Sequence, residues 1–299
     1  MTVGVLAMAY GTPASPADVE SYYTHIRRGR PPTPEQLADL QRRYDAIGGI
    51  SPLLEITRAQ CGRLQDALGD GFAVQLGQKH AAPFIEDGVE SLAVAGVTSI
   101  VGLVLAPHYS AFSVGQYADR LAKAAAGHGL PSTTVESWHT LPAYLAFLAD
   151  AVHDALAEVP DGAEVVFTAH SLPQRITETG DPYPAQVRET AAEVAERRKL
   201  TRWSTGWQSA GRTPEPWLGP DILDVVRGRS RAGSPGLVAC PCGFMADHLE
   251  VLFDLDIEAR GVAAEVGLPF ARTRSLNDDP AVFAALADVV RRESAGRRG

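Results

Sequence analysis

The stretch Glu164-Val-Val-Phe-Thr-Ala-His170-Ser-Leu-Pro173 is the strongest indication of the fold in this sequence. Its apolar run is typical of a strand buried in a parallel sheet, and Pro173 ends the strand soon after His170. In open α/β sheets, ligands bind outside the carboxyl ends of the strands. Imidazole both accepts protons near neutral pH and binds metals. The stretch therefore predicts an α/β fold with His170 at a ligand-binding edge, with an ordinary loop histidine as the alternative.

Strand-like and helix-like segments alternate on both sides of this stretch. Short apolar runs bounded by Gly and Pro predict strands at residues 3–8, 73–76, 99–105, 133–136, 165–169, 202–207 and 236–239. Helical periodicity predicts helices at residues 16–28, 34–44, 55–68, 85–95, 114–126, 141–158, 183–199 and 221–226. This alternation predicts mainly parallel sheets that are covered by helices on both faces.

The length of 299 residues suits two α/β units in succession. Gly, Pro and Ser are concentrated between residues 127 and 132, which predicts a boundary there. We therefore expect two similar Rossmann-like domains, at residues 1–130 and 131–299, with a C-terminal helix that could pack back on the first. The polar tail at residues 291–299 is expected to fray.

Composition restricts the functional classes. The net charge of -9 argues against a general affinity for nucleic acid. The longest apolar run, at residues 100–107, is far shorter than the roughly 20 residues that a membrane-spanning helix needs. The apolar N-terminus lacks the charged start of a signal peptide, so it is expected to be a first strand and the protein to be cytoplasmic.

Three strand ends in the sequence are weakly similar to one another. The segments at residues 5–13, 104–110 and 166–173 each pass from apolar residues to an aromatic or histidine beside small polar residues. If the two halves arose by duplication, this pattern places Tyr10, His108 and His170 at strand ends that face one cleft. The alternative is the general similarity of α/β strands.

Basic residues are bunched near the N-terminus in an otherwise acidic chain. Arg27, Arg28 and Arg30 are followed, after a Pro-rich turn, by Arg42 and Arg43. Arginine offers forked donors that suit a carboxylate or phosphate ligand. A solvated helix end is the alternative.

An acidic stripe follows the strand predicted at residues 236–239. Asp247 is expected to cap a helix on which Glu250, Asp254 and Glu258 recur at steps of four and so form one line. Such a line is stable in water, and it can also host a hard cation, because these ions prefer oxygen ligands. Glu250 comes at the first helical turn after a strand end, which is the level at which His170 leaves its own strand. This shared level favours one site for both residues.

The cysteines do not match a usual cluster motif. Cys61, Cys240 and Cys242 are the three thiols in the chain, whereas a structural zinc or iron–sulfur site usually uses four ligands. An odd number of cysteines also argues against a disulfide framework. We therefore expect free thiols and no required cofactor, with redox sensitivity of Cys240 and Cys242 left open.

With these residues in hand, the chain resembles the ferrochelatases over residues 3–290. In the first half the resemblance rests on Met8-Ala-Tyr-Gly-Thr-Pro13, Tyr22-Tyr-Thr-His-Ile-Arg-Arg-Gly-Arg30, Arg43-Tyr-Asp-Ala-Ile-Gly-Gly-Ile-Ser-Pro52 and Leu105-Ala-Pro-His-Tyr-Ser110. In the second half it rests on Ala169-His-Ser-Leu-Pro173, Gly180-Asp-Pro-Tyr-Pro184, Gly206-Trp-Gln-Ser209, Pro214-Glu-Pro-Trp-Leu-Gly-Pro220 and Gly243-Phe-Met-Ala-Asp-His-Leu-Glu250. So many long segments in one order are highly specific.

The resemblance implies a monomer of two chelatase-type domains with a porphyrin cleft between them. It implies that His170 and Glu250 face the porphyrin centre and handle Fe2+ as a substrate, and that Tyr10 lies near the opposite face. It assigns contacts with the porphyrin edge or its propionates to Arg27, Arg43, Tyr44, Ser51 and Tyr117. It assigns an outer metal site to Asp254 and Glu258.

The soluble Gram-positive members that this chain resembles insert Fe2+ into coproporphyrin III to give Fe-coproporphyrin. In the expected reaction the ring is held distorted, and His170, neutral at working pH, takes a pyrrole proton or holds Fe2+ with Glu250 as second base or ligand. The alternatives are a protoporphyrin IX ferrochelatase and a non-catalytic porphyrin- or haem-binding protein. Neighbouring enzymes of haem biosynthesis are candidate partners.

Overall fold

The computed structural model describes residues 2–296, and within that part of the chain eight strands form two parallel sheets of four strands each. The first sheet has the order β2-β1-β3-β4, with β1 (Val3–Ala9), β2 (Phe72–Gln78), β3 (Ser99–Val104) and β4 (Ser132–Val135). The second has the order β6-β5-β7-β8, with β5 (Glu164–His170), β6 (Trp203–Gln208), β7 (Leu237–Cys240) and β8 (Phe270–Arg272). The two sheets therefore repeat one topology.

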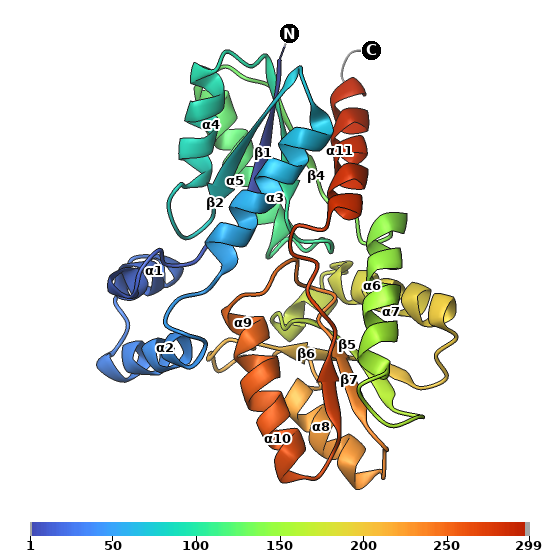
Figure 1. Ribbon diagram of the computed structural model, residues 1–299. Coiled ribbons are helices and arrows are strands. Elements are labelled where there is room, and N and C mark those ends of the chain that lie inside the picture. Colours follow the sequence, from blue (N-terminus) through green and yellow to red (C-terminus); the bar gives the residue numbers. More distant parts are fainter. Residues whose placement is uncertain (1, 297–299) are drawn as a thin grey trace.

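Helices cover both faces of the first sheet, in the upper half of Figure 1. The alternation of side chains along β1 explains this, because Val3 and Val5 pack toward one face and Leu6 and Met8 toward the other. The first face is covered by α3 (Leu53–Leu68) and α11 (Pro280–Ala295), and the second by α4 (Ile85–Val94) and α5 (Val114–Gly127). The short η1 (Pro16–Asp18), α1 (Val19–Ile26) and α2 (Pro34–Ala46) project to one side (Figure 1).

The second sheet is covered in the same way. Phe167 packs against the side of α6 (Pro142–Leu156) and α7 (Tyr183–Arg198), whereas Val166 packs against α8 (Ile222–Arg231) and α10 (Arg260–Glu265). The short α9 (Leu249–Leu252) leads into a π-helix, η3 (Asp254–Ala259), which continues into α10. The short 3-10 helix η2 (Gln174–Thr177) precedes α7.

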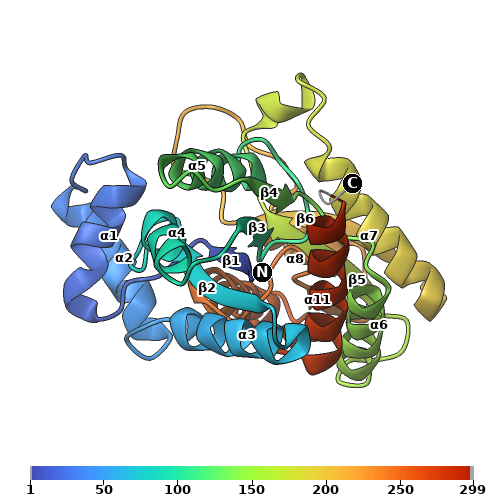
Figure 2. The ribbon, with the colours of Figure 1, turned by 90° about the horizontal axis from the view of Figure 1, so that it is seen from above.

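One apolar core joins the two halves. Val5 and Leu64 of the first half belong to the same cluster of buried side chains as Phe167 and Val187 of the second. In Figure 2, α11 lies beside α3 and next to α6, at the place where the halves meet. None of the helices in the described part of the chain combines the length and the apolar character that a membrane crossing requires.

The predicted fold class is confirmed, with three differences in the secondary structure. Strand β8 was missed because it is three residues long, and the helix predicted at residues 221–226 continues to Arg231. The tail expected to fray is helical to Ala295, because Val290 is buried and anchors the last turns of α11. Residues 297–299 of the tail lie outside the described residues.

The predicted limit between residues 130 and 131 precedes β4, which pairs with β3 in the first sheet. The first sheet therefore extends past that limit to Val135. The contacts of α11 with α3, β3 and β4 place this C-terminal helix against the first half. The division into domains stays a prediction.

Candidate active site

His170 stands at the carboxyl end of the central strand β5, and Glu250 stands in α9, which follows the neighbouring strand β7. The imidazole Nε2 lies 3.6 Å from the carboxylate Oε1 of Glu250. Gly243 makes this approach possible, because a Cβ there would lie 2.5 Å from the Cβ of Ala169. The loop that leads to Glu250 can therefore lie directly against the end of β5.

A second histidine flanks the same carboxylate. His248 Nε2 lies 3.7 Å from Oε2 of Glu250, on the oxygen that does not face His170. His248 was not among the predicted site residues, although it stands two positions before Glu250 in the segment Gly243-Phe-Met-Ala-Asp-His-Leu-Glu250. Glu250 thus lies between two imidazoles.

The pair of His170 and Glu250 is electrostatically coupled. Burial by itself lowers the pKa of His170, but the charge and hydrogen bonding of Glu250 and the carbonyl of Ser171 outweigh it, so the pKa is raised. Burial by itself raises the pKa of Glu250, but the charge of His170 and hydrogen bonding outweigh it, so that pKa lies well below its usual range. The imidazole of His170 therefore holds a proton to higher pH than an ordinary histidine, and the neutral His170 expected at working pH stays a prediction.

The tautomer of His170 is consistent with a proton acceptor. Its Nδ1 lies in hydrogen-bonding contact with the carbonyl oxygen of Ser171, which makes Nδ1 the protonated nitrogen of the neutral ring. Nε2 then carries the free lone pair beside Glu250. A proton that arrives at Nε2 gives an imidazolium next to a carboxylate.

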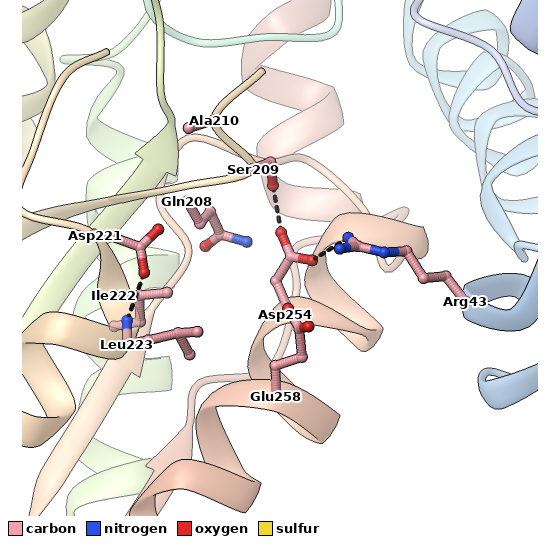
Figure 3. Close-up of a pocket in the computed structure, with 9 residues that line it drawn as sticks. All are labelled: Arg43, Gln208, Ser209, Ala210, Asp221, Ile222, Leu223, Asp254 and Glu258. Carbon is pink, nitrogen blue, oxygen red and sulfur yellow. Dashed lines mark hydrogen bonds and ion pairs between the residues drawn. The ribbon is translucent and has the colours of Figure 1, made fainter. Parts of the chain in front are cut away.

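The acidic stripe continues into a small cavity of about 170 Å³ (Figure 3). Asp254 and Glu258 line it together with Arg43, Gln208 and Ser209. The Ser209 hydroxyl donates to Asp254, and the Arg43 guanidinium lies 3.6 Å from the same carboxylate. Burial and then the charge of Glu250 raise the pKa of Asp254 to about 7, against the opposing effects of Ser209 and Arg43. Asp254 is therefore partly protonated near neutral pH.

The stripe does not run along a regular α-helix. The amide of Glu258 donates to the carbonyl of Phe253, 2.9 Å away and five residues back, which is the π-helical pattern. Within residues 2–296 no group of three or more His, Cys, Asp or Glu side chains is arranged to hold a metal ion. The stripe is thus a sequence of separate acidic positions.

Asp247 does not cap the helix, so that prediction is wrong. His248 occupies the N-cap position without a side-chain cap bond. Asp247 instead accepts hydrogen bonds from Ser275 and Asn277 and lies 3.3 Å from the guanidinium of Arg272. Its carboxylate ties the loop before α9 to the segment after β8.

Tyr10 follows β1 and is 44% exposed, with its ring 4.6 Å from that of His80. Desolvation and then the charge of Glu250 raise the pKa of its phenol. The ring of Tyr117 on α5 is buried beneath the Lys79 ammonium, which lies 5.0 Å from its centroid.

The remaining predicted edge residues make local contacts. Tyr44 is only 3% exposed and lies 3.4 Å from the Thr12 hydroxyl. Ser51 accepts a hydrogen bond from the amide of Leu53 at the start of α3. Arg27 ends α1 and donates to the carbonyl of Arg30. Their predicted contacts with a porphyrin stay predictions.

His108 was expected beside one cleft with His170 only if the two halves arose by duplication, and it makes different contacts. Its side chain is buried, and its Nε2 lies 2.9 Å from the hydroxyl of Thr190 on α7. Burial and then His139 lower its pKa to about 3. His108 instead contributes to the contact between the two halves.

The three cysteines are free thiols. Burial raises the pKa of Cys61 and of Cys240 to about 12 and raises that of Cys242 well above its usual range. Because the thiolate is the form that reacts and binds metals, these thiols are poorly suited to either role at neutral pH.

The two-sheet fold has solved counterparts. SirB from Bacillus subtilis with Fe3+ has a TM-score of 0.60 and 13% identity, covering 100% of this chain and 98% of that one. The sirohydrochlorin chelatase SirB from Bacillus subtilis subspecies spizizenii in complex with cobalt has a TM-score of 0.55 and 13% identity, over 97% and 94% of the two chains. At this identity the likeness shows the fold alone, and the fold is that of the chelatases.

Sequence comparison narrows the class. The family model described as ferrochelatase matches residues 2–294. The coproporphyrin III ferrochelatase of Geobacillus thermodenitrificans is 47% identical over 97% of this chain and 95% of that protein. That of Bacillus subtilis (strain 168) is 45% identical over 96% of each. The chain belongs to the ferrochelatase family, and the resemblance that the sequence predicted is confirmed.

Proposed function

We propose that this protein inserts Fe2+ into coproporphyrin III to give Fe-coproporphyrin, a step of haem biosynthesis. The observation that carries the proposal is the pair of His170 and Glu250, whose side chains approach to 3.6 Å. The names of relatives at 45–47% identity support the choice of substrate. The porphyrin would lie with its centre between His170 and Tyr10.

The pair supplies what proton removal requires. Two pyrrole protons must leave the free-base ring as Fe2+ enters, so that the product porphyrin is a dianion. His170 would accept a proton at Nε2, and the adjacent Glu250 would stabilise the imidazolium that forms. The raised pKa of His170 favours this proton uptake. The imidazole of His170 must itself be deprotonated before it can accept a pyrrole proton.

The acidic positions would bring Fe2+ toward the porphyrin. Asp254 and Glu258 line one cavity, whereas Glu250, the preceding acidic residue of the stripe, lies beside His170. Oxygen ligands suit a hydrated divalent ion, and successive carboxylates can replace its waters in stages. The Arg43 guanidinium lies 3.6 Å from Asp254, and we expect it to leave this carboxylate in order to reach a propionate.

The remaining predicted residues would hold the edge of the ring. Arg27 offers a guanidinium to a propionate, as does Arg43 once it is released. Tyr44, Ser51 and Tyr117 would act chiefly by shaping the walls, since their side chains are largely buried. We place the reaction in the cytoplasm of the cell and expect a monomer that needs no bound cofactor.

One experiment separates the candidate functions. Purified protein is mixed anaerobically with Fe2+ and with either coproporphyrin III or protoporphyrin IX, and insertion is followed through the change in the Soret band. We expect faster insertion into coproporphyrin III. Faster insertion into protoporphyrin IX would overturn the substrate while sparing the enzyme class. Binding of either porphyrin without insertion would support a non-catalytic carrier instead.

A further inference from the structure

Gln208 contacts both sides of the His170–Glu250 pair. It ends β6, directly opposite His170 in the parallel register of β5 and β6, and its carbonyl accepts a hydrogen bond of 2.7 Å from the amide of Ser171. Its side-chain Nε2 donates a hydrogen bond of 2.8 Å to the backbone carbonyl of Glu250. One residue therefore links the strand that carries the histidine to the helix that carries the carboxylate.

The side chain of Gln208 has no freedom to act as a solvent-facing group. It is fully buried at the wall of the cavity shown in Figure 3, beside Ser209 and across from Asp254. Its Oε1 has no hydrogen-bond partner among residues 2–296. Burying an amide whose oxygen has no hydrogen-bond partner costs stability. The bond that the Gln208 amide makes to Glu250 therefore calls for an explanation other than stability.

The first half of the molecule contains the matching residue. Gln78 ends β2, which holds the same place in the first sheet as β6 holds in the second. It is also fully buried, and its Oε1 also lacks a partner among residues 2–296. Its Nε2, however, bonds to the carbonyl of Ala82, four residues away in the same loop. The corresponding bond of Gln208 spans 42 residues and reaches the site.

We propose that Gln208 is a positioning residue, whose amide holds the main chain of Glu250 so that its carboxylate stays opposite His170. The inference rests on the proposed function, because it concerns the geometry of metal insertion. Nothing in this role requires Gln208 to touch porphyrin or iron. Its loss should therefore slow insertion without weakening porphyrin binding.

The test compares Gln208→Leu and Gln208→Glu with the wild type, using whichever porphyrin the wild type metallates. Gln208→Leu removes the donor to Glu250, and Gln208→Glu keeps the shape of the side chain but can donate to that carbonyl only while its carboxyl is protonated. We expect kcat to fall roughly 10- to 100-fold, as for a misplacement of about 1 Å in a catalytic group. The KM for porphyrin and the Kd of porphyrin from fluorescence quenching should change less than about twofold, because the proposed role of Gln208 includes no contact with the porphyrin.

Gln60 provides the matched control. It is equally buried on α3, and its Nε2 donates a hydrogen bond of 2.8 Å to the backbone carbonyl of Asn277, which holds Asp247 in the loop before α9 and does not bond to Glu250 itself. Gln60→Leu should lower the melting temperature about as much as Gln208→Leu but leave kcat within about twofold. Equal losses of kcat in the two variants would mean that Gln208 has a structural role only.

A double-mutant cycle shows whether Gln208 acts through Glu250. In a Glu250→Gln background, Gln208→Glu should lower the remaining kcat less than about twofold, because the group that it positions is already disabled. A full additional 10-fold loss would overturn the proposal. If Gln208→Leu does not fold, Gln208→Glu still decides through this cycle.

Failure of the proposed function would be recognised separately. A wild type that metallates no porphyrin refutes the function, and the position of the Glu250 main chain in crystals of wild type and Gln208→Glu then tests the inference alone. An unchanged His170–Glu250 separation in that comparison would contradict it. An active wild type whose kcat is insensitive to Gln208 would refute the inference and spare the function.

Discussion

His170 is the residue whose chemistry the structure defines most closely. Its Nδ1 contacts the Ser171 carbonyl, and its Nε2 faces Glu250. We predict that His170→Ala lowers the rate of Fe2+ insertion at least about 100-fold, since general acid–base groups commonly contribute that much. Porphyrin affinity, measured by fluorescence quenching, should stay within about threefold. His153→Ala on α6 is a control for histidine loss, and substantial turnover by His170→Ala would contradict the assigned role.

Asp254 predicts a pH dependence of stability. Burial and then the charge of Glu250 raise its pKa in the folded protein to about 7, from an ordinary value of 3.8. The folded state therefore holds a proton that the unfolded chain releases, and the resulting stabilisation is lost as the pH rises from about 4 through about 7. We predict that Asp254→Asn gains about 1–3 kcal/mol relative to the wild type across this window. Urea unfolding at pH 4.5, 6 and 7.5 measures it, and a constant difference would refute it.

Single residues were predicted where a local motif marks them. His170 follows an apolar strand, and Glu250 follows a glycine break, so both were expected near one edge. His248 was not found, because its role depends on where the turn after Gly243 directs the chain. The upward shift of the His170 pKa could not be predicted either, since it depends on a partner 80 positions away in the sequence.

At the scale of elements, the π-helix η3 is held in place by one buried guanidinium. Arg272 on β8 donates two hydrogen bonds to Asp256, at 2.8 and 2.9 Å. We predict that Arg272→Met destabilises the protein by about 2 kcal/mol, because it leaves two partly buried carboxylates without their partner. Arg260→Met is the control, since the exposed Arg260 lies 3.9 Å from Asp256 and its loss should cost less than about 1 kcal/mol. Equal costs in urea unfolding would refute the assignment.

The predicted elements were accurate where periodicity is strong. The seven predicted strands occur within a few residues of their expected places, because each is a buried apolar run between turn residues. The π-helix could not be predicted, because the spacing of Glu250, Asp254 and Glu258 also fits an α-helix. The apolar side chains of this segment, Leu255 and Ala259, pack in one buried cluster with side chains of α8, a contact that no local pattern specifies.

At the scale of the whole molecule, α11 joins the end of the chain to the first half. Leu286 on α11 is fully buried in the core cluster that both halves share. We predict that Leu286→Ala costs about 2–5 kcal/mol and shifts a single unfolding transition. The exposed Asp288→Ala on the same helix should change stability by less than about 0.5 kcal/mol. Two separate transitions in urea, monitored by circular dichroism and fluorescence, would show that the halves unfold independently.

The sequence by itself determined the parallel α/β class, the strand-end position of His170, the acidic residues after β7 and the family. These features follow from periodicities and motifs within short segments, and local sequence carries them completely. The tertiary structure alone brings Gln208 and His248 to Glu250 and buries His108 between the halves. Those relations depend on the order of strands in each sheet and on packing between segments far apart in the chain, which no local pattern specifies.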